Sequence, residues 1–121
     1  RPAEYTSRLA WRTSQPSPIA KVLPGWPYRE ARRSYKLDLR LPDGTQVELF
    51  SFPDPPKRPS YPEACGLRHL AFVVDDVPAC KARLEAQGIA VDPVRVDEYT
   101  GRRFTFFSDP DGLPLELYEA G

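Results

Sequence analysis

The sequence predicts a mixed α+β fold made of two related halves, and two observations support this prediction. The first is an ungapped repeat: residues 42–50 (PDGTQVELF) read as turn, strand, carboxylate and aromatic, and residues 110–118 (PDGLPLELY) repeat that order 68 positions later. The second is the pattern of the second half, which reads strand, helix, strand, strand, strand. Because a repeat defines the building unit of a fold, the unit here is about half the chain.

The second half is predicted element by element. Residues 67–74 are an apolar run that is typical of a buried strand. Asp76 can cap a helix over residues 77–87, with Pro78 in its first turn and Gly88 at its end. Further strands are expected over 89–96, 103–108 and 115–119, with turns at 99–102 and 109–112.

The first half shows only the later part of this order clearly. Residues 35–41 alternate apolar and polar side chains, as in a half-buried strand, and a second strand is expected over 45–52. Upstream, residues 3–13 predict a short helix and 19–23 a short strand, separated by prolines that would stop a helix. The Pro-rich residues 53–62 predict an extended connector between the halves.

Composition excludes several classes of function. The 121 residues are enough for one domain with a core, and a net charge of +0 with mixed signs gives no electrostatic footprint for nucleic acid. No apolar run approaches the length of a membrane span, and no signal peptide is evident. Cys65 and Cys80 lack metal-type spacing, so we expect reduced thiols and a cytoplasmic location.

The repeat itself suggests a metal site. If the halves pair about a pseudo-twofold axis, Glu48 and Glu116 face each other, and two converging carboxylates need a cation or a proton between them. His69, the only histidine, lies in the apolar run, and the position 68 residues before it is Arg1, which cannot donate a lone pair. The sequence therefore offers three candidate ligands, Glu48, His69 and Glu116.

With these residues placed, the chain resembles the vicinal oxygen chelate superfamily, and in particular its bacterial glyoxalase I-like (lactoylglutathione lyase-related) branch. The segments that carry the resemblance are 28–32 (YREAR), 48–53 (ELFSFP), 59–72 (PSYPEACGLRHLAF) and 103–119 (RFTFFSDPDGLPLELYE). It implies the glyoxalase/bleomycin resistance/dioxygenase fold of two βαβββ modules within a single domain over 1–121. The first module would span 1–52 with an incomplete or altered N-terminus, the connector 53–62 and the second module 63–121.

The resemblance also implies a function. Glu48, His69 and Glu116 match three of the family's four metal ligands, the first His has no counterpart, and the metal would be Ni²⁺, Zn²⁺ or Mn²⁺. The implied reaction is isomerisation of a thiohemiacetal of an α-oxoaldehyde, with Glu116 as the proton shuttle and Glu48 assisting. A homodimer acting on a small molecule is expected. The alternatives are a non-catalytic, resistance-type binding protein of the same fold and an inactive domain with an incomplete metal site.

Five further residues are candidates for binding the substrate. Phe50 and Phe106 could line a pocket, Arg103 could pair with a substrate anion, as could Arg95, and Tyr99 could lie in a lid. Each also has an ordinary structural interpretation. Aromatic residues at strand positions are usually core, surface arginines are usually solvated, and Tyr99 lies in a predicted turn. A strand Glu is usually exposed, and a lone His in an apolar strand is usually a packing residue.

Overall fold

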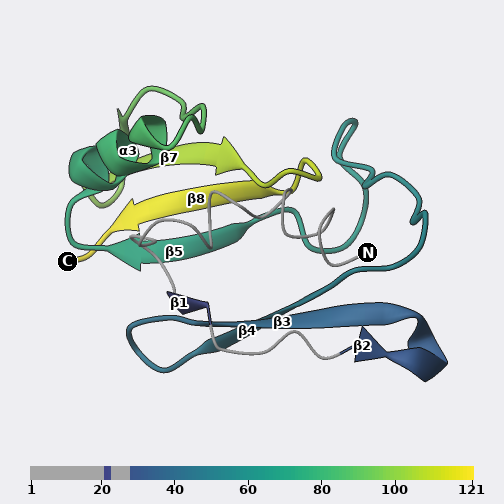
Figure 1. Ribbon diagram of the computed structural model, residues 1–121. Helices are drawn as coiled ribbons and strands as arrows, with labels where there is room; N and C mark the ends of the chain where they lie inside the picture. The colour runs from purple at the N-terminus through teal and green to yellow at the C-terminus, as the bar shows by residue number, and fades with distance from the viewer. Residues whose placement is uncertain (1–20, 23–27) are drawn as a thin grey trace. The chain divides into compact units, whose positions relative to one another are not determined.

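The computed structural model describes residues 21–22 and 28–121. The chain divides into two compact units, Arg1–Pro56 and Lys57–Gly121, here called unit 1 and unit 2. Each has its own sheet, and unit 2 contains the α-helix of the described residues (Figure 1). The predicted α+β class is confirmed.

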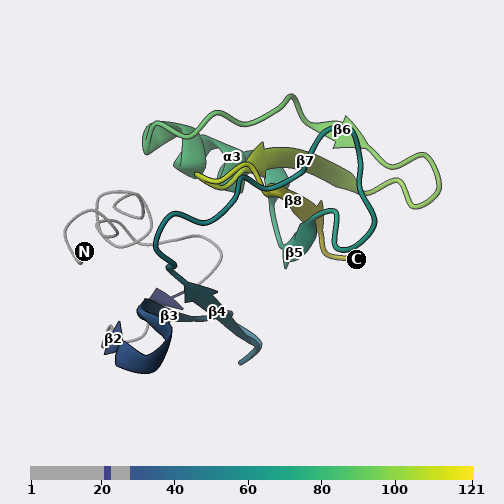
Figure 2. The ribbon, with the colours of Figure 1, turned by 90° about the vertical axis from the view of Figure 1, so that its right-hand side faces the viewer.

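Unit 2 has the predicted β-α-β-β-β order. Its elements are β5 (Leu70–Val74), α3 (Val77–Ala86), β6 (Arg95–Val96), β7 (Arg103–Ser108) and β8 (Pro114–Glu119). The strands lie in the order β5-β8-β7-β6, with β5 parallel to β8 and the other pairs antiparallel (Figure 2). The helix connects β5 to the other strands, as a parallel strand pair requires a crossover.

The helix covers one face of this sheet. Asp76 caps it as predicted, because its side chain accepts a hydrogen bond of 2.9 Å from the backbone N–H of Ala79. The helix buries Val77, Cys80 and Leu84. The sheet side of this core consists of Val74, Thr105, Phe107, Leu115 and Leu117. Full burial of Leu84 or Leu117 stabilises the fold by about 1.5–3 kcal/mol each.

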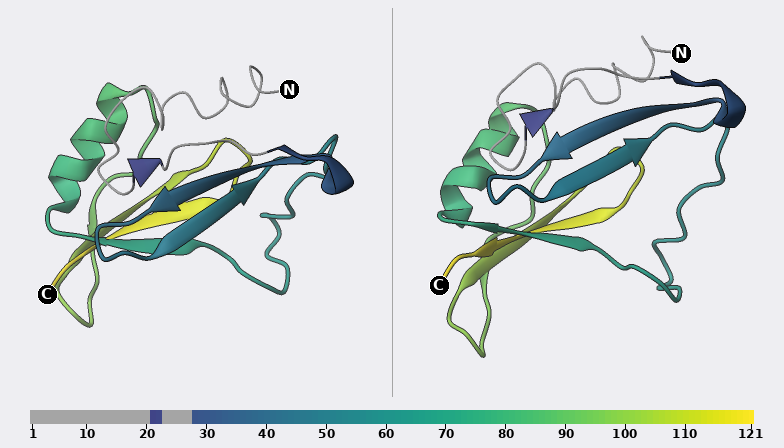
Figure 3. Two further views of the ribbon diagram at one scale, coloured as in Figure 1. Left: turned by 60° about the horizontal axis from the view of Figure 1, so that its bottom comes forward. Right: turned by 90° about the horizontal axis from the view of Figure 1, so that it is seen from below.

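Unit 1 is built around a hairpin of β3 (Ser34–Arg40) and β4 (Gln46–Phe50), visible in Figure 3. Two short strands, β1 (Lys21–Val22) and β2 (Tyr28–Arg29), pair with β3 near its two ends, and the 3-10 helix η1 (Glu30–Arg32) follows β2. One face of the hairpin is apolar and consists of Leu37, Leu39, Val47 and Leu49. The other face carries mostly charged and polar side chains, including Glu48.

The two hairpins repeat each other in register and in turn geometry. Asp38 lies opposite Glu48 in unit 1, and Phe106 lies opposite Glu116 in unit 2. Both residues of the second pair lie 68 positions after their counterparts in the first pair. The turns make the same two backbone bonds at equivalent positions. Gly44 and Gly112 both adopt positive φ, 88° and 87°, which favours glycine. The repeat read from the sequence is thus a repeat of backbone structure.

Most predicted element bounds agree with the structure within one or two residues. β7 matches 103–108, β8 begins one residue before the expected 115, and α3 ends one residue before 87. The hairpin strands β3 and β4 lie close to the expected 35–41 and 45–52, and β1 lies within 19–23. The short helix expected over 3–13 lies outside the described residues.

The strand predicted over 67–74 begins later, at Leu70. The residues before Leu70 bind a side chain instead of a neighbouring strand. The Nη2 of Arg58 donates to the carbonyl oxygens of Leu67 and Arg68 at 2.7 and 3.1 Å. His69 therefore lies immediately before β5 and not within the strand.

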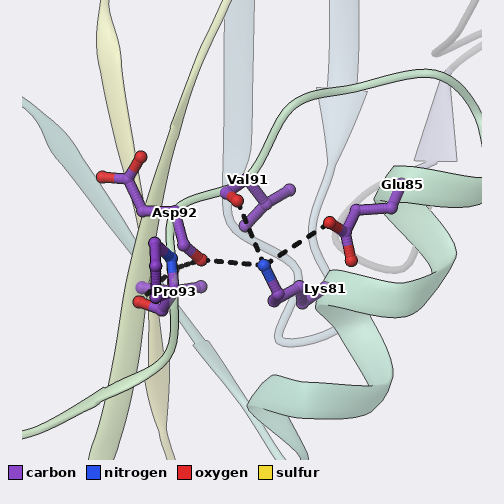
Figure 4. Close-up of polar contacts among 6 residues, drawn as sticks. Lys81, Glu85, Val91, Asp92 and Pro93 are labelled. Atoms are coloured by element: carbon purple, nitrogen blue, oxygen red, sulfur yellow. Dashed lines mark hydrogen bonds and ion pairs between the residues drawn. The ribbon is translucent and has the colours of Figure 1, made fainter.

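The strand predicted over 89–96 is also shorter, because β6 covers only Arg95–Val96. Upstream, a single bridge joins Val91 to Phe107. Lys81 of α3 donates through Nζ to the carbonyl oxygens of Val91 and Asp92 at 3.1 and 3.0 Å, and it also pairs with Glu85 (Figure 4). Side-chain donors thus replace strand pairing in this segment.

Candidate functional site

The face of the unit 2 sheet opposite α3 carries Glu116 and Phe106, two of the predicted functional residues. Alternate residues of a strand point to opposite faces, and Thr105, Phe107, Leu115 and Leu117 are buried on the helix side. One row across the open face, from β5 to β6, consists of Val73, Tyr118, Phe104 and Arg95. The neighbouring row consists of Ala71, Glu116 and Phe106. This surface is called the open face below.

His69 and Glu116 meet at this face. The His69 Nε2 lies 3.9 Å from the Glu116 Oε1, and the His69 ring contacts the Phe106 ring edge to face, with 5.1 Å between ring centres. The Glu116 side chain is 15% exposed and that of His69 is 40% exposed. The carboxylate is therefore largely enclosed, whereas the imidazole is accessible to a ligand.

The pair is close to two positions of a divalent metal site. Imidazole nitrogen and carboxylate oxygen bind ions such as Zn²⁺ at about 2.0–2.2 Å, so two donors of a tetrahedral site lie about 3.4 Å apart. The separation of 3.9 Å between Nε2 and Oε1 is somewhat longer, so the two side chains would have to approach each other slightly to bind one ion. Among the described residues, no three His, Cys, Asp or Glu side chains are gathered into a ligand cluster. The participation of Glu48 as the third ligand stays a prediction.

Glu48 has a different environment in unit 1. Its Oε1 lies 2.6 Å from the Nζ of Lys36, which also lies 3.4 Å from the Oδ1 of Asp38. The hydrogen bond to Glu48 is the main cause that raises the pKa of Lys36 above its usual value. Lys36 was not predicted as a site residue, although its position two residues from Asp38 puts both side chains on one strand face.

The predicted substrate-binding residues lie in different surroundings. Phe106 lies on the open face against His69, whereas Phe50 is on the unit 1 hairpin, stacked on Phe52 and under the Arg29 guanidinium. Tyr99 is 91% exposed at the tip of the turn between β6 and β7. Its role in a lid stays a prediction.

Arg103 does not share the face of Glu116. It alternates with Phe104 and lies on the α3 side of the sheet, where Nε and Nη2 donate to the two carboxylate oxygens of Glu119. This bidentate ion pair lowers the pKa of Glu119. The guanidinium of Arg103 is therefore already neutralised within the sheet.

A polar network that sequence reasoning missed flanks Glu116. The Tyr118 hydroxyl donates to the Asp97 Oδ2 at 2.8 Å and lies 2.5 Å from the Thr100 Oγ1. The pKa of Asp97 is lowered, chiefly by the hydrogen bond from the Tyr99 backbone N–H and then by that from Tyr118. The network fixes the turn between β6 and β7 to the open face. Its signal in the sequence is only the alternation of Glu116 and Tyr118 on β8.

Comparison with known proteins places this geometry in a family. The model of the glyoxalase/bleomycin resistance protein/dioxygenase superfamily matches residues 8–117. The chain belongs to this superfamily. The vicinal oxygen chelate resemblance seen in the sequence is thereby confirmed. None of the helices in the described part of the chain has the length and apolar character needed to span a membrane.

Two bacterial proteins are similar to this chain in sequence. The uncharacterized protein YaeR of Escherichia coli is 65% identical over 92 residues, which cover 76% of this chain and 71% of YaeR. The uncharacterized protein YwkD of Bacillus subtilis is 60% identical over 92 residues, covering 76% of this chain and 72% of YwkD.

Solved structures show the same fold. The glyoxalase family protein of Enterococcus faecalis is 44% identical, with a TM-score of 0.78 over 96% of this chain and 87% of that protein. A mutant of the fosfomycin resistance protein FosX of Listeria monocytogenes, solved with Mn(II) and 1S,2S-dihydroxypropylphosphonic acid, is 18% identical. Its TM-score is 0.64, over 98% of this chain and 83% of FosX, so this likeness concerns the fold alone.

Proposed function

We propose that the protein is a glyoxalase I-like, metal-dependent isomerase of the lyase class. Its substrate would be a small oxygenated molecule such as the thiohemiacetal of an α-oxoaldehyde. The observation that carries the proposal is the His69–Glu116 pair, which lies on the open face of a βαβββ unit with 3.9 Å between nitrogen and oxygen. Superfamily membership and the presence of Mn(II) in the FosX complex support binding of a divalent ion.

Each residue has a role in this proposal. Glu48, His69 and Glu116 would hold a Ni²⁺, Zn²⁺ or Mn²⁺ ion, which when bound polarises two adjacent oxygens of a substrate. Glu116 takes a proton from one substrate carbon and returns it to the neighbouring carbon, acting first as base and then as acid. Phe106, in contact with His69 and opposite Glu116, limits the access of water to the reacting carbons.

Metal content and turnover test the proposal together. After loading with each metal and desalting, wild-type protein should retain a stoichiometric ion, and His69→Ala should lose most of it. Wild-type protein should isomerise the thiohemiacetal of methylglyoxal and glutathione. Glu116→Gln keeps the shape of the side chain but removes the base, so turnover should fall by about 10²–10⁴-fold. Elemental analysis and an absorbance assay measure the two quantities.

Glu85→Gln is the matched control, because it removes an equivalent carboxylate from the helix side of unit 2, where the side chain is 49% exposed. It should leave both quantities unchanged. Equal metal content in wild-type protein and His69→Ala would exclude His69 as a ligand. Undiminished turnover in Glu116→Gln would exclude Glu116 as the proton shuttle.

A second function is favoured by the environment of Glu48. Its carboxylate is already neutralised by Lys36 at 2.6 Å, as it would be by a metal ion. This arrangement suits a metal-free, resistance-type binding protein of the same fold. Such a protein would contain no stoichiometric metal and would show no turnover, so the same experiment separates the two functions. A cytoplasmic homodimer belongs to both versions of the proposal, and sedimentation equilibrium measures its assembly.

A further inference from the structure

Arg95 is the cation of the open face. Its Cζ lies 4.8 Å from the centre of the Phe104 ring and 5.7 Å from that of the Phe106 ring. Cation–π attraction to aromatic rings within about 6 Å favours this position of the guanidinium and uses none of its N–H donors. The side chain is thus drawn to the open face without using its hydrogen-bond donors.

Those donors have no anionic partner in the described part of the chain, where no ion pair involves Arg95. Three other arginines of unit 2 are engaged. Arg103 is paired with Glu119 on the helix side, and Arg58 and Arg68 donate to backbone carbonyl oxygens. Arg95 therefore offers the open face a guanidinium that can donate hydrogen bonds to an external oxyanion.

Phe106 connects Arg95 to the His69–Glu116 pair. Its ring centre lies 5.7 Å from the Arg95 Cζ and 5.1 Å from the centre of the His69 ring. The sum of these distances, 10.8 Å, is the upper limit for the separation of the guanidinium carbon from the imidazole. One small molecule can therefore reach both groups, with its apolar part lying over aromatic carbon.

We propose that Arg95 binds a carboxylate or similar oxyanion of the same small molecule whose vicinal oxygens meet His69 and Glu116. This inference rests on the proposed function and narrows its substrate to anionic molecules. A guanidinium fork matches a carboxylate with two parallel hydrogen bonds, which orients the molecule as well as attracting it. The anion selects the substrate and its direction of binding, while the chemistry stays at Glu116.

The test compares two chelating probes that differ in one charged group. Acetohydroxamate presents two vicinal oxygens and no further charge, whereas succinic acid monohydroxamate adds a carboxylate a few bonds away. Both are titrated into metal-loaded protein by calorimetry. Wild-type protein should bind the carboxylate-bearing probe about 5- to 20-fold more tightly than acetohydroxamate. This preference should weaken with added salt. Arg95→Gln should remove both the preference and its salt dependence while leaving the affinity for acetohydroxamate unchanged.

Arg83→Gln is the control, because it removes the same charge from an exposed position in the last turn of α3, on the helix side of the sheet. It should keep the preference, and Arg95→Lys should keep part of it. If the wild-type protein binds acetohydroxamate but shows no preference, the Arg95 subsite is wrong and the metal site stands. If Arg95→Gln keeps the preference, the anion is bound elsewhere. If wild-type protein binds neither probe, the metal site fails, and with it this inference.

Discussion

At the residue scale, two carboxylates occupy equivalent backbone positions in opposite surroundings. Glu116 faces the aromatic ring of Phe106, whereas Glu48 faces Asp38 and is paired with Lys36. The Glu116 carboxylate is largely enclosed beside an imidazole, whereas the Glu48 carboxylate is more exposed and is held by an ammonium group. The two copies of the repeat therefore place their carboxylates in chemically different environments.

The Arg103–Glu119 pair gives a prediction for pH dependence. Because the pKa of Glu119 in the folded protein is below its ordinary value of 4.5, the ionised carboxylate stabilises the fold above that pH. This contribution is lost as the pH falls through the folded-state pKa. The free energy of unfolding should therefore drop more steeply below about pH 4.5 in wild-type protein than in Glu119→Gln. Urea titrations at several pH values measure it.

Glu85→Gln serves as a control here too, since it removes an acidic group whose partner, Lys81, lies 3.5 Å away on the helix surface. Its pH profile should follow that of the wild-type protein more closely than the profile of Glu119→Gln does. Parallel curves for wild-type protein and Glu119→Gln would contradict the prediction.

Several residues of the open face were candidates in the sequence, but their contacts were not predicted. Glu116 and His69 were candidates because the repeat and the apolar run point to them, and Phe106 because aromatic side chains often line ligand pockets. The role of Arg103 in substrate binding stays a prediction, and its pairing with Glu119 was not predicted because it depends on the pairing of β7 with β8. Likewise, Lys36 reaches Glu48 only through the pairing of β3 with β4.

At the element scale, the helix and the hairpins were predicted well from the sequence, whereas the irregular segments before β5 and β6 were wrongly predicted to be strands. Capping by Asp76 and the Pro-Asp-Gly turns are local effects that neighbouring residues determine. By contrast, the backbone near 67–68 and 91–92 is held by the side chains of Arg58 and Lys81, which are distant in sequence. Propensity within a short window contains no information about such donors.

Lys81 provides the prediction at this scale. Lys81→Met keeps the aliphatic stem but removes the ammonium that satisfies the carbonyl oxygens of Val91 and Asp92. Thr105 still donates to the Asp92 carbonyl at 2.7 Å, so the loss should be modest, about 1–2 kcal/mol. Urea unfolding measures it. Arg83→Met, an equivalent change at an exposed position of the same helix, should cost less than half as much, and an equal cost would contradict this role.

At the scale of the whole molecule, the repeat predicted the architecture of both units. The strands β2, β3 and β4 of unit 1 correspond to β6, β7 and β8 of unit 2. Residues that pair in unit 1 have counterparts 68 positions later that pair in unit 2, and the strand order is the same. The segments that would match β5 and α3 lie outside the described residues of unit 1. The convergence of Glu48 with His69 and Glu116 through a pseudo-twofold axis stays a prediction.

The two units should differ in local stability. Among the described residues, unit 2 buries a core of eight side chains between α3 and the sheet, whereas unit 1 buries three, Ser34, Leu37 and Leu39. Amide hydrogens of β7 and β8 should therefore exchange more slowly than those of β3 and β4, because opening unit 2 exposes more apolar surface. Hydrogen exchange followed by mass spectrometry measures this order. Equal protection of the two hairpins would contradict it.

The placement of Cys80 on the buried side of α3 has a consequence for the thiol chemistry of the chain. Burial raises the pKa of the Cys80 thiol, whereas Cys65 is exposed in the segment before β5. The thiolate is the form that attacks an alkylating reagent or a disulfide, so Cys65 reacts in the folded protein, whereas Cys80 reacts only when α3 separates from the sheet. A probe can therefore be attached selectively at Cys65, and the rate of alkylation of Cys80 reports how often unit 2 opens.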